Sequence, residues 1–390
     1  MSKENIHNYD RRLERTLINL KKSILSEADK ELLIKFHDSM FLQGLSVSKI
    51  ERYLYDAYRF GLMLNADLKN ATKEDIQKLV IDIEKKDWTP SSKSTFKLMI
   101  RKLYKFVEGV EEQGVYPNKV KWIKTHISKS NEKLPEELLT PEEVVSIISC
   151  ADNFRDKAFI STLYETGCRI SELALVKIKQ IQFDVYGAKI NISGKTGSRR
   201  LRVVSSSPFL QDWINNHPFN KENDCPVWIS RESKKPLSYE RIAYIIRKVA
   251  KKAGINKRVN PHNFRHSRAT YLANHLTEAQ LKEYFGWTQS SDMSAVYIHL
   301  SMKETENALL KLSGINVNEE EQKQIVNPKC PRCNTINKIT SRFCDNCGLI
   351  LDEKIGKDTI KADLDRQRAD EVMNRLAQNP KFIELLNELK

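Results

Sequence analysis

Hydrophobic side chains recur at intervals of three and four residues through the first third of the chain. This spacing aligns apolar side chains on one face of an α-helix, so the pattern predicts a helical region. The predicted helices span residues 30–43, 47–64, 73–86 and 91–109, after a charged helix at 1–28 that carries a leucine stripe. The residues predicted to cap the first turns of the four later helices are Asp29, Ser46, Thr72 and Ser91.

The hydrophobic period changes to two between residues 183 and 204. Apolar and polar residues alternate over 188–192 and again over 201–204, and a glycine-containing turn separates the two runs. Such a pattern predicts a β-hairpin. Helical spacing covers residues 154–176 before the hairpin, and after it 206–216, 238–253, 261–275, 277–286 and 302–312. The second half of the chain is therefore expected to be mixed α and β, with helix dominant.

A polar, proline-bearing segment at residues 129–139 predicts a linker between two larger domains. Thr140 and Pro141, followed by two glutamates, then favour the start of a helix. The expected fold is mainly α with one α/β domain. Its expected parts are the N-terminal helix 1–28, a helical domain 29–128, an α/β domain 140–315, a cysteine-bearing module 328–351 and a helical tail 357–390.

The chain of 390 residues carries a formal net charge of +14. This excess favours a polyanionic partner such as double-stranded DNA, because each neutralised phosphate releases counterions. A solubility charge and binding to a membrane surface are the alternatives. Lys97, Arg101 and Lys105 recur every four residues on one predicted helix. This basic face can follow a DNA backbone, although a solvated helix face has the same pattern.

The chain contains no apolar run of the roughly 20 residues that cross a bilayer, and its first 20 residues include no apolar signal core. We therefore expect a cytoplasmic protein at the nucleoid, with no membrane partner.

Four of the seven cysteines form two CxxC pairs near the C-terminus. Paired thiolates at this spacing are typical of a zinc ribbon, in which four ligands surround Zn²⁺ and leave no open position. The predicted zinc is therefore structural, and a redox pair is the alternative. The predicted ligands are Cys330, Cys333, Cys344 and Cys347.

Four separated motifs carry groups suited to phosphate chemistry. They are ETGCRISEL at 165–173, GKTG at 194–197, PHNFRH at 261–266, and the run from FGW to AVYIH at 285–299. Arginine forks can hold phosphate oxygens, and a tyrosine hydroxyl can act as a nucleophile. Each motif alone has an ordinary structural explanation, such as a surface ion pair. In this order they resemble the tyrosine recombinase (phage integrase) family over about residues 30–315, and the motifs look somewhat archaeal.

The resemblance implies a core-binding helical domain, a catalytic domain and a reaction that needs no cofactor for its chemistry. Tyr297 would attack a DNA phosphate and store the bond energy as a 3′-phosphotyrosine. The other residues that the resemblance implies are Arg169 and Arg265 as phosphate ligands, His262 as proton acceptor or phosphate donor, Lys195 as general acid, Trp287 as a donor beside the tyrosine, and Glu172 as an orienting group.

The sequence departs from the family pattern at several points. The hairpin reads Gly-Lys-Thr where many members have Gly-Lys-Gly, Phe264 replaces a leucine, and Trp287 stands where many have histidine. The other basic residues that compete with Lys195 for the role of general acid are Lys189, Arg199 and Arg200.

The resemblance also implies a homotetramer on paired DNA sites, in which residues 302–314 look like the helix that members pass to a neighbour. The appended ribbon favours integration or excision of a mobile element. The alternatives are resolution of chromosome dimers, strand relaxation like that of a type IB topoisomerase, and an inactive DNA-binding regulator. The sequence identifies no accessory protein.

Overall fold

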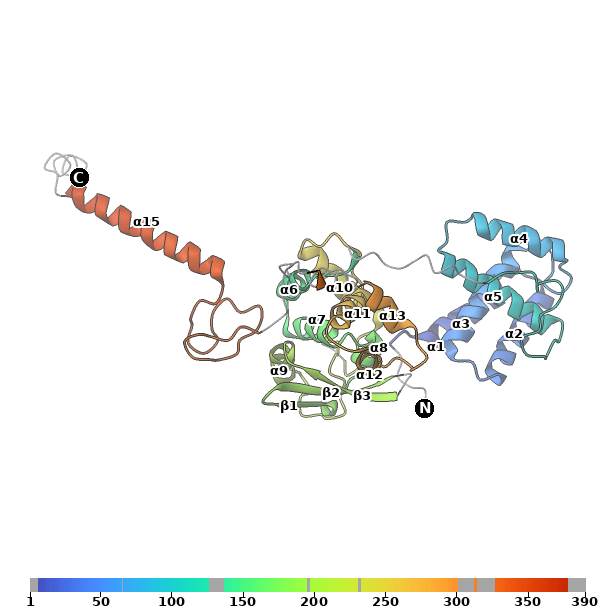
Figure 1. The fold of residues 1–390 in the computed structure, drawn as a ribbon. Coiled ribbons are helices and arrows are strands. Elements are labelled where there is room, and N and C mark those ends of the chain that lie inside the picture. The colour runs from blue at the N-terminus through green and yellow to red at the C-terminus, as the bar shows by residue number, and fades with distance from the viewer. Residues whose placement is uncertain are drawn as a thin grey trace. The chain divides into compact units, whose positions relative to one another are not determined.

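The computed structural model describes residues 6–64, 66–125, 137–194, 197–230, 233–300, 312–313 and 327–377. The chain divides into two compact units, Met1–Glu132 and Lys133–Lys390. The first unit is helical, and the second combines helices with a small sheet, so the mainly α fold class is confirmed (Figure 1).

The first unit packs its helices around one apolar core. Its helices are α1 Tyr9–Lys21, α2 Glu27–Leu42, α3 Val47–Met63, α4 Lys73–Lys85 and α5 Pro90–Val107. Leu13 and Leu20 of α1 are buried in the same cluster as Phe60 of α3 and Phe96 of α5. The charged N-terminal helix thus belongs to the core of this unit, because its leucine stripe is covered by the other helices.

Two of the predicted helix starts in this unit are wrong. The N-caps lie three residues before Asp29 and two residues before Ser91, because Ser26 and Thr89 accept backbone N–H bonds of the first turns. Asp29 is instead buried and accepts a hydrogen bond from the backbone N–H of Leu68 at 2.9 Å. The predicted N-caps that the structure confirms are Ser46 and Thr72.

The second unit places a three-stranded antiparallel sheet among its helices. Its strands are β1 Ile181–Asp184, β2 Gly187–Gly194 and β3 Gly197–Val203, in the order β1-β2-β3. The predicted hairpin is confirmed as β2 and β3, which pair from Ala188 with Val203 to Gly194 with Gly197. Its helices are α6 Pro141–Cys150, α7 Phe154–Thr166, α8 Ile170–Ala174, α9 Ser207–Asn215, α10 Tyr239–Lys252, α11 Pro261–Ala273, α12 Glu278–Phe285 and α13 Met293–Leu300.

The continuous helix expected at 154–176 is wrong, because the chain breaks between α7 and α8. Gly167 ends α7 with φ of +53°, a left-handed conformation that favours glycine. A Cβ at Gly167 would also lie 2.7 Å from the ring of Phe285. The break makes Arg169 the N-cap residue of α8. Residues 293–300 form α13, which the hydrophobic pattern did not predict.

The C-terminal part contains a cysteine module and a long helix. Two isolated antiparallel bridges, Lys329 with Ile336 and Phe343 with Ile350, close the two loops of the module. Helix α15 spans Glu353–Ala377 and begins four residues before the predicted tail. The helix predicted at 302–312 lies almost wholly outside the described residues, as does Pro380. Across the described ranges, the structure contains no helix long and apolar enough to cross a membrane.

Candidate active site and metal centre

Arg265 joins three elements at the centre of the second unit. Asn260 caps α11 through bonds from the backbone N–H groups of residues 262 and 263, and this start places Arg265 in the second turn. Its guanidinium donates to the carbonyl oxygens of Gly167 at 2.9 Å and Phe285 at 3.0 Å. Burial lowers the pKa of Arg265 to about 10, and the nearby charge of Arg169 acts in the same direction. The group is thus a preorganised cation at neutral pH.

Glu172 ties Arg169 to the sheet. The carboxylate of Glu172 accepts from the backbone N–H and the guanidinium of Arg169, both at 3.0 Å. It also accepts from Arg199 of β3 at 2.8 Å. Burial by itself would raise the pKa of Glu172, but the hydrogen bonds from Arg199 and Arg169 hold that pKa below its usual value. Glu172 therefore remains charged and orients two arginines.

The end of β2 lies against this carboxylate. A Cβ built on Gly194 would lie 2.3 Å from Oε1 of Glu172, so the close approach requires glycine. Lys195, the next residue in the sequence, lies outside the described residues.

The three competitors of Lys195 each have a partner on the sheet or beside it. Arg199 also donates to the carbonyl oxygen of Tyr284 at 2.9 Å. Arg200 donates to the side chain of Asn191 at 3.0 Å, and Lys189 forms an ion pair with Asp184 at 3.4 Å. These contacts give the three side chains structural roles in the sheet.

Tyr297 is buried against Trp287. The two rings stack with centroids 5.4 Å apart and an interplanar angle of 2°, and only 2% of Tyr297 is exposed. Burial raises the pKa of Tyr297 to about 12, although the positive charge of Arg265 lowers it in part. The guanidinium of Arg265 lies 5.6 Å from the ring centroid of Trp287. The structure thus brings Arg265, Trp287 and Tyr297 together, with the tyrosine as a neutral phenol.

His266 contacts the phenol. Nδ1 of His266 and the hydroxyl oxygen of Tyr297 are 2.5 Å apart. His262 is exposed one helical turn earlier, with its ring centroid 6.3 Å from that of His266. His266 was not among the predicted site residues. Its position four residues after His262, on the same face of a predicted helix, was the available signal.

The basic stripe of α5 has partners within its own unit. Lys97 pairs with Glu84 at 2.7 Å, and Lys105 donates to the carbonyl oxygen of Glu112 at 2.5 Å. The guanidinium of Arg101 lies 3.7 Å from the ring centroid of Tyr116. These contacts stabilise the helical unit, and contact of this face with DNA stays a prediction.

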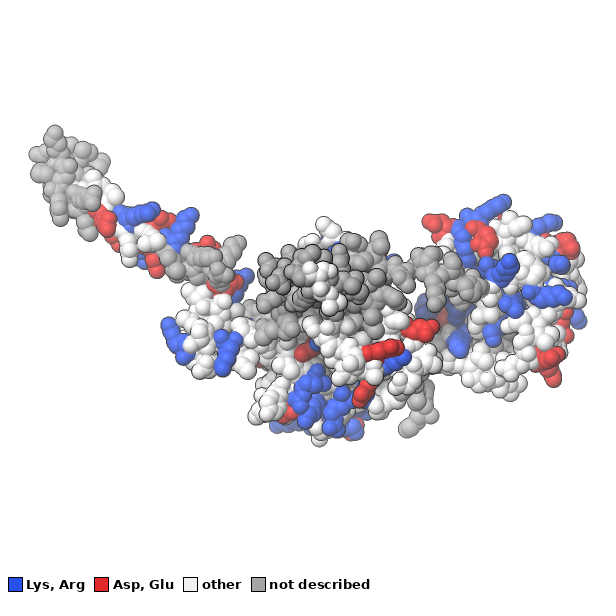
Figure 2. Space-filling model, in the orientation of Figure 1, with Lys and Arg blue, Asp and Glu red and all other residues white. Residues whose placement is uncertain are grey.

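Basic side chains also gather in the second unit. Figure 2 shows Lys and Arg side chains over the three-stranded sheet. Lys189, Arg200 and Arg202 lie on β2 and β3 and are half-buried or exposed. This surface can attract a polyanion.

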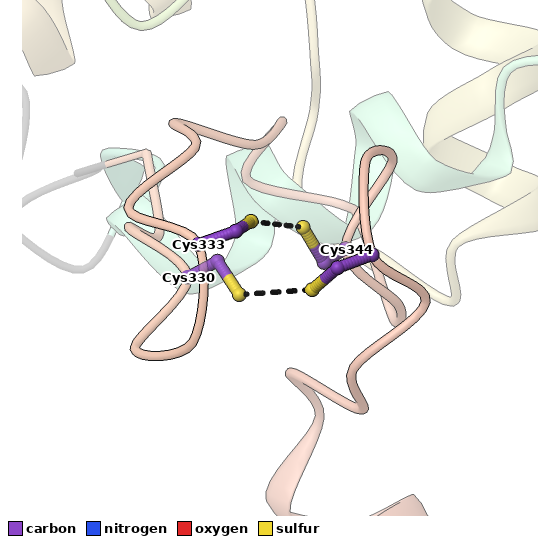
Figure 3. Close-up of side chains that lie close together, drawn as sticks. Cys330, Cys333 and Cys344 are labelled. Carbon is purple, nitrogen blue, oxygen red and sulfur yellow. Dashed lines mark hydrogen bonds between the residues drawn. The ribbon is translucent and has the colours of Figure 1, made fainter.

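The four C-terminal cysteines converge on one point. Their sulfur atoms all lie within 4.8 Å of one another, and two pairs, Cys330 with Cys347 and Cys333 with Cys344, are 3.5 Å apart (Figure 3). In each loop a left-handed residue follows the second cysteine, Asn334 in the first and Gly348 in the second.

The donor set fits a tetrahedral thiolate site. Ligands about 2.3 Å from a central Zn²⁺ would lie roughly 3.8 Å apart, close to the distances between these sulfur atoms. The four cysteines could therefore hold a metal ion without rearrangement of the loops. Four protein ligands leave no position for a substrate, so such a metal would have a structural role.

Comparison with known proteins adds to this geometry. Residues 137–304 match the phage integrase family. The chain is 27% identical over 290 residues to the tyrosine recombinase XerA of Pyrococcus horikoshii, which covers 73% of this chain and 94% of that protein. It is 28% identical over 276 residues to a tyrosine recombinase of Thermosipho africanus, over 68% of this chain and 94% of the relative.

A solved structure shares the fold. The XerH site-specific recombinase bound to its palindromic difH substrate matches with a TM-score of 0.56 at 17% identity. The match covers 80% of this chain and 98% of that one.

Proposed function

The chain belongs to the tyrosine recombinase (phage integrase) family, and we propose on this basis that Tyr297 cuts and rejoins DNA strands at specific sites through a 3′-phosphotyrosine. The observation that carries the proposal is the convergence of α11, α12 and α13. These elements place Arg265, Trp287 and Tyr297 together, beside the start of α8 with Arg169.

The chemistry explains the choice of residues. The hydroxyl of Tyr297 attacks the phosphorus, and the 5′-oxygen leaves, so the strand break conserves one phosphoester bond. The transition state carries additional negative charge on the non-bridging oxygens. Arg169 and Arg265 are the proposed ligands of these oxygens, because preorganised donors usually contribute the largest catalytic effect.

The remaining groups complete the proposed site. Lys195 is the proposed general acid for the leaving oxygen, supported by the approach of Gly194 to Glu172. Glu172 would orient Arg169, with which it shares two hydrogen bonds. Trp287 would buttress Tyr297, and His262 would donate to the phosphate from the exposed start of α11.

We expect Arg265→Lys to slow formation of the covalent complex by roughly 10²- to 10³-fold. Lysine keeps the positive charge, but its single nitrogen cannot occupy the positions of both guanidinium nitrogens that donate to Gly167 and Phe285. A single-turnover assay on nicked DNA measures the rate, and the thermal unfolding midpoint reports whether the fold survives. A folded variant with the wild-type rate would remove Arg265 from the proposed phosphate ligands.

Covalent trapping tests the proposed function directly. The purified protein is incubated with nicked duplexes drawn from the DNA that flanks its gene, and the reaction is quenched with detergent. We expect protein-linked DNA, and a nucleotide adduct on the peptide that contains Tyr297. An adduct on another residue, or salt-sensitive binding without an adduct while an active family member is trapped in parallel, would contradict the proposal.

The sequence of the trapped DNA also identifies the biological role. We propose integration or excision of a mobile element, because this chain carries a C-terminal cysteine module and long helix beyond its catalytic region. Trapped DNA at the boundary of such an element supports this role. Trapped DNA at a single chromosomal site far from any element supports resolution of chromosome dimers instead.

Double-stranded DNA, a homotetramer and zinc complete the proposal. Solved relatives of the same fold include a lambda integrase tetramer bound to a Holliday junction, at 15% identity and a TM-score of 0.53. We propose a tetramer on paired sites for this chain too. We further propose that Cys330, Cys333, Cys344 and Cys347 hold Zn²⁺, which suits four thiolates at these distances.

A further inference from the structure

A hydrogen bond between His266 and Tyr297 connects helices α11 and α13 at the tyrosine hydroxyl. The two residues are 31 positions apart, and the bond joins α11 to α13. The side chain of His266 is half-buried, and its ring centroid lies 5.8 Å from that of Tyr297. A phenol with an ordinary pKa near 10 needs a proton acceptor to attack at neutral pH. An imidazole whose Nδ1 carries no proton can accept the hydroxyl proton at this distance.

The place of each histidine on α11 separates their roles. His262 follows Pro261 in the first turn of the helix, where its side chain is exposed. His266 lies one turn deeper and touches the hydroxyl itself. The rings of His262 and Tyr297 lie beside that of His266. Arg265, the preceding residue of α11, lies within electrostatic range of Arg169, Glu172 and Tyr297. The positive charge of Arg265 favours the phenolate form of Tyr297.

We propose that His266, and not His262, accepts the proton of Tyr297 during attack on DNA. The inference deepens the proposed function and rests on it. The hydroxyl proton passes to Nδ1 of His266, the new bond forms between the tyrosine oxygen and phosphorus, and the bond to the 5′-oxygen breaks. The expelled oxygen takes a proton from the general acid of the site. Rejoining reverses each transfer, and His266 returns the proton to Tyr297.

The first test is His266→Asn in the single-turnover trapping assay. The carbonyl oxygen of asparagine can occupy the position of Nδ1 and accept the same hydrogen bond, but it does not take up a proton at neutral pH. We expect the rate of covalent complex formation to fall by about 10²-fold. His262→Asn is the matched variant on the same helix face. His275 is exposed in the turn after α11, and His275→Asn alone should leave the rate unchanged.

A second test separates proton transfer from positioning. Tyr297 is replaced by 2,3-difluorotyrosine, whose more acidic phenol needs less help from a base. In the His266→Asn chain this replacement should restore the rate by about 10-fold, whereas in the wild-type chain it should change the rate little. His266→Ala should also regain activity with added imidazole. Thermal unfolding midpoints report whether each variant folds. If His266→Asn does not fold, His266→Ala with added imidazole replaces it in this test.

Each outcome decides between defined alternatives. If His266→Asn reacts as fast as wild type or faster, the histidine only holds the tyrosine at rest, and the proposal is wrong. A slow variant that neither the acidic phenol nor imidazole restores has lost a structural contact, which also overturns the proposal. If the wild-type chain forms no covalent complex, the proposed function itself fails, which is a separate result.

Discussion

Tyr297→Phe is expected to reduce covalent complex formation to background, a loss on the order of 10⁶-fold if the hydroxyl is the nucleophile. Phenylalanine preserves the ring that stacks on Trp287, so the buried packing should survive. The loss of the hydroxyl removes its hydrogen bond to the half-buried His266, which is expected to cost about 0.5–1.5 kcal/mol of stability. Denaturing gels measure the protein-linked DNA, and thermal unfolding measures the stability.

The control for this prediction is a half-buried tyrosine that packs against the same hydrophobic cluster as Tyr297. Tyr284 donates its hydroxyl to the carbonyl oxygen of Glu165 at 2.9 Å, so Tyr284→Phe has a similar structural consequence. We expect Tyr284→Phe to retain covalent trapping and Tyr297→Phe to retain salt-sensitive DNA binding. Trapping that persists in Tyr297→Phe would assign the nucleophile to another residue. Loss of trapping in both variants would point to a defect in folding.

Cys344→Ser is expected to abolish zinc binding and unfold the cysteine module. Structural zinc contributes an apparent binding free energy of about 10–16 kcal/mol in small zinc-binding peptides, and this module has few buried side chains to replace that contribution. Atomic emission analysis should find one zinc per wild-type chain and none in the variant. Limited proteolysis should then cut the variant within residues 328–351, while wild type resists until a chelator is added.

Cys150→Ser is the matched control, because Cys150 ends α6 and is not among the four clustered cysteines. It should keep its zinc and its resistance to protease. Covalent trapping should persist in Cys344→Ser, because the proposed catalytic residues lie between 169 and 297. A wild-type chain that binds no zinc, or a Cys344→Ser module that stays resistant, would contradict the structural role of the metal.

Short-range patterns in the sequence determined much of this protein. The spacing of apolar residues located most helices of both units, and alternation located β2 and β3, because each pattern follows from the local geometry of one element. The CxxC pairs likewise predicted the clustering of the four cysteines. The motifs around Arg169, Arg265 and Tyr297 indicated the family, and the part of these residues in catalysis stays a prediction.

The tertiary structure decided how those residues meet. The spacing of apolar residues predicted one continuous helix over α7 and α8. It did not show the break, because the close packing of Phe285 against Gly167 is a contact between distant segments. The burial of Tyr297 on Trp287 and its bond to His266 likewise depend on how α11, α12 and α13 pack. The partners of Lys97, Arg101 and Lys105 come from other segments of the first unit, as do those of Arg199 in the second. Such contacts depend on how separate elements pack against one another, which the pattern within one element does not encode.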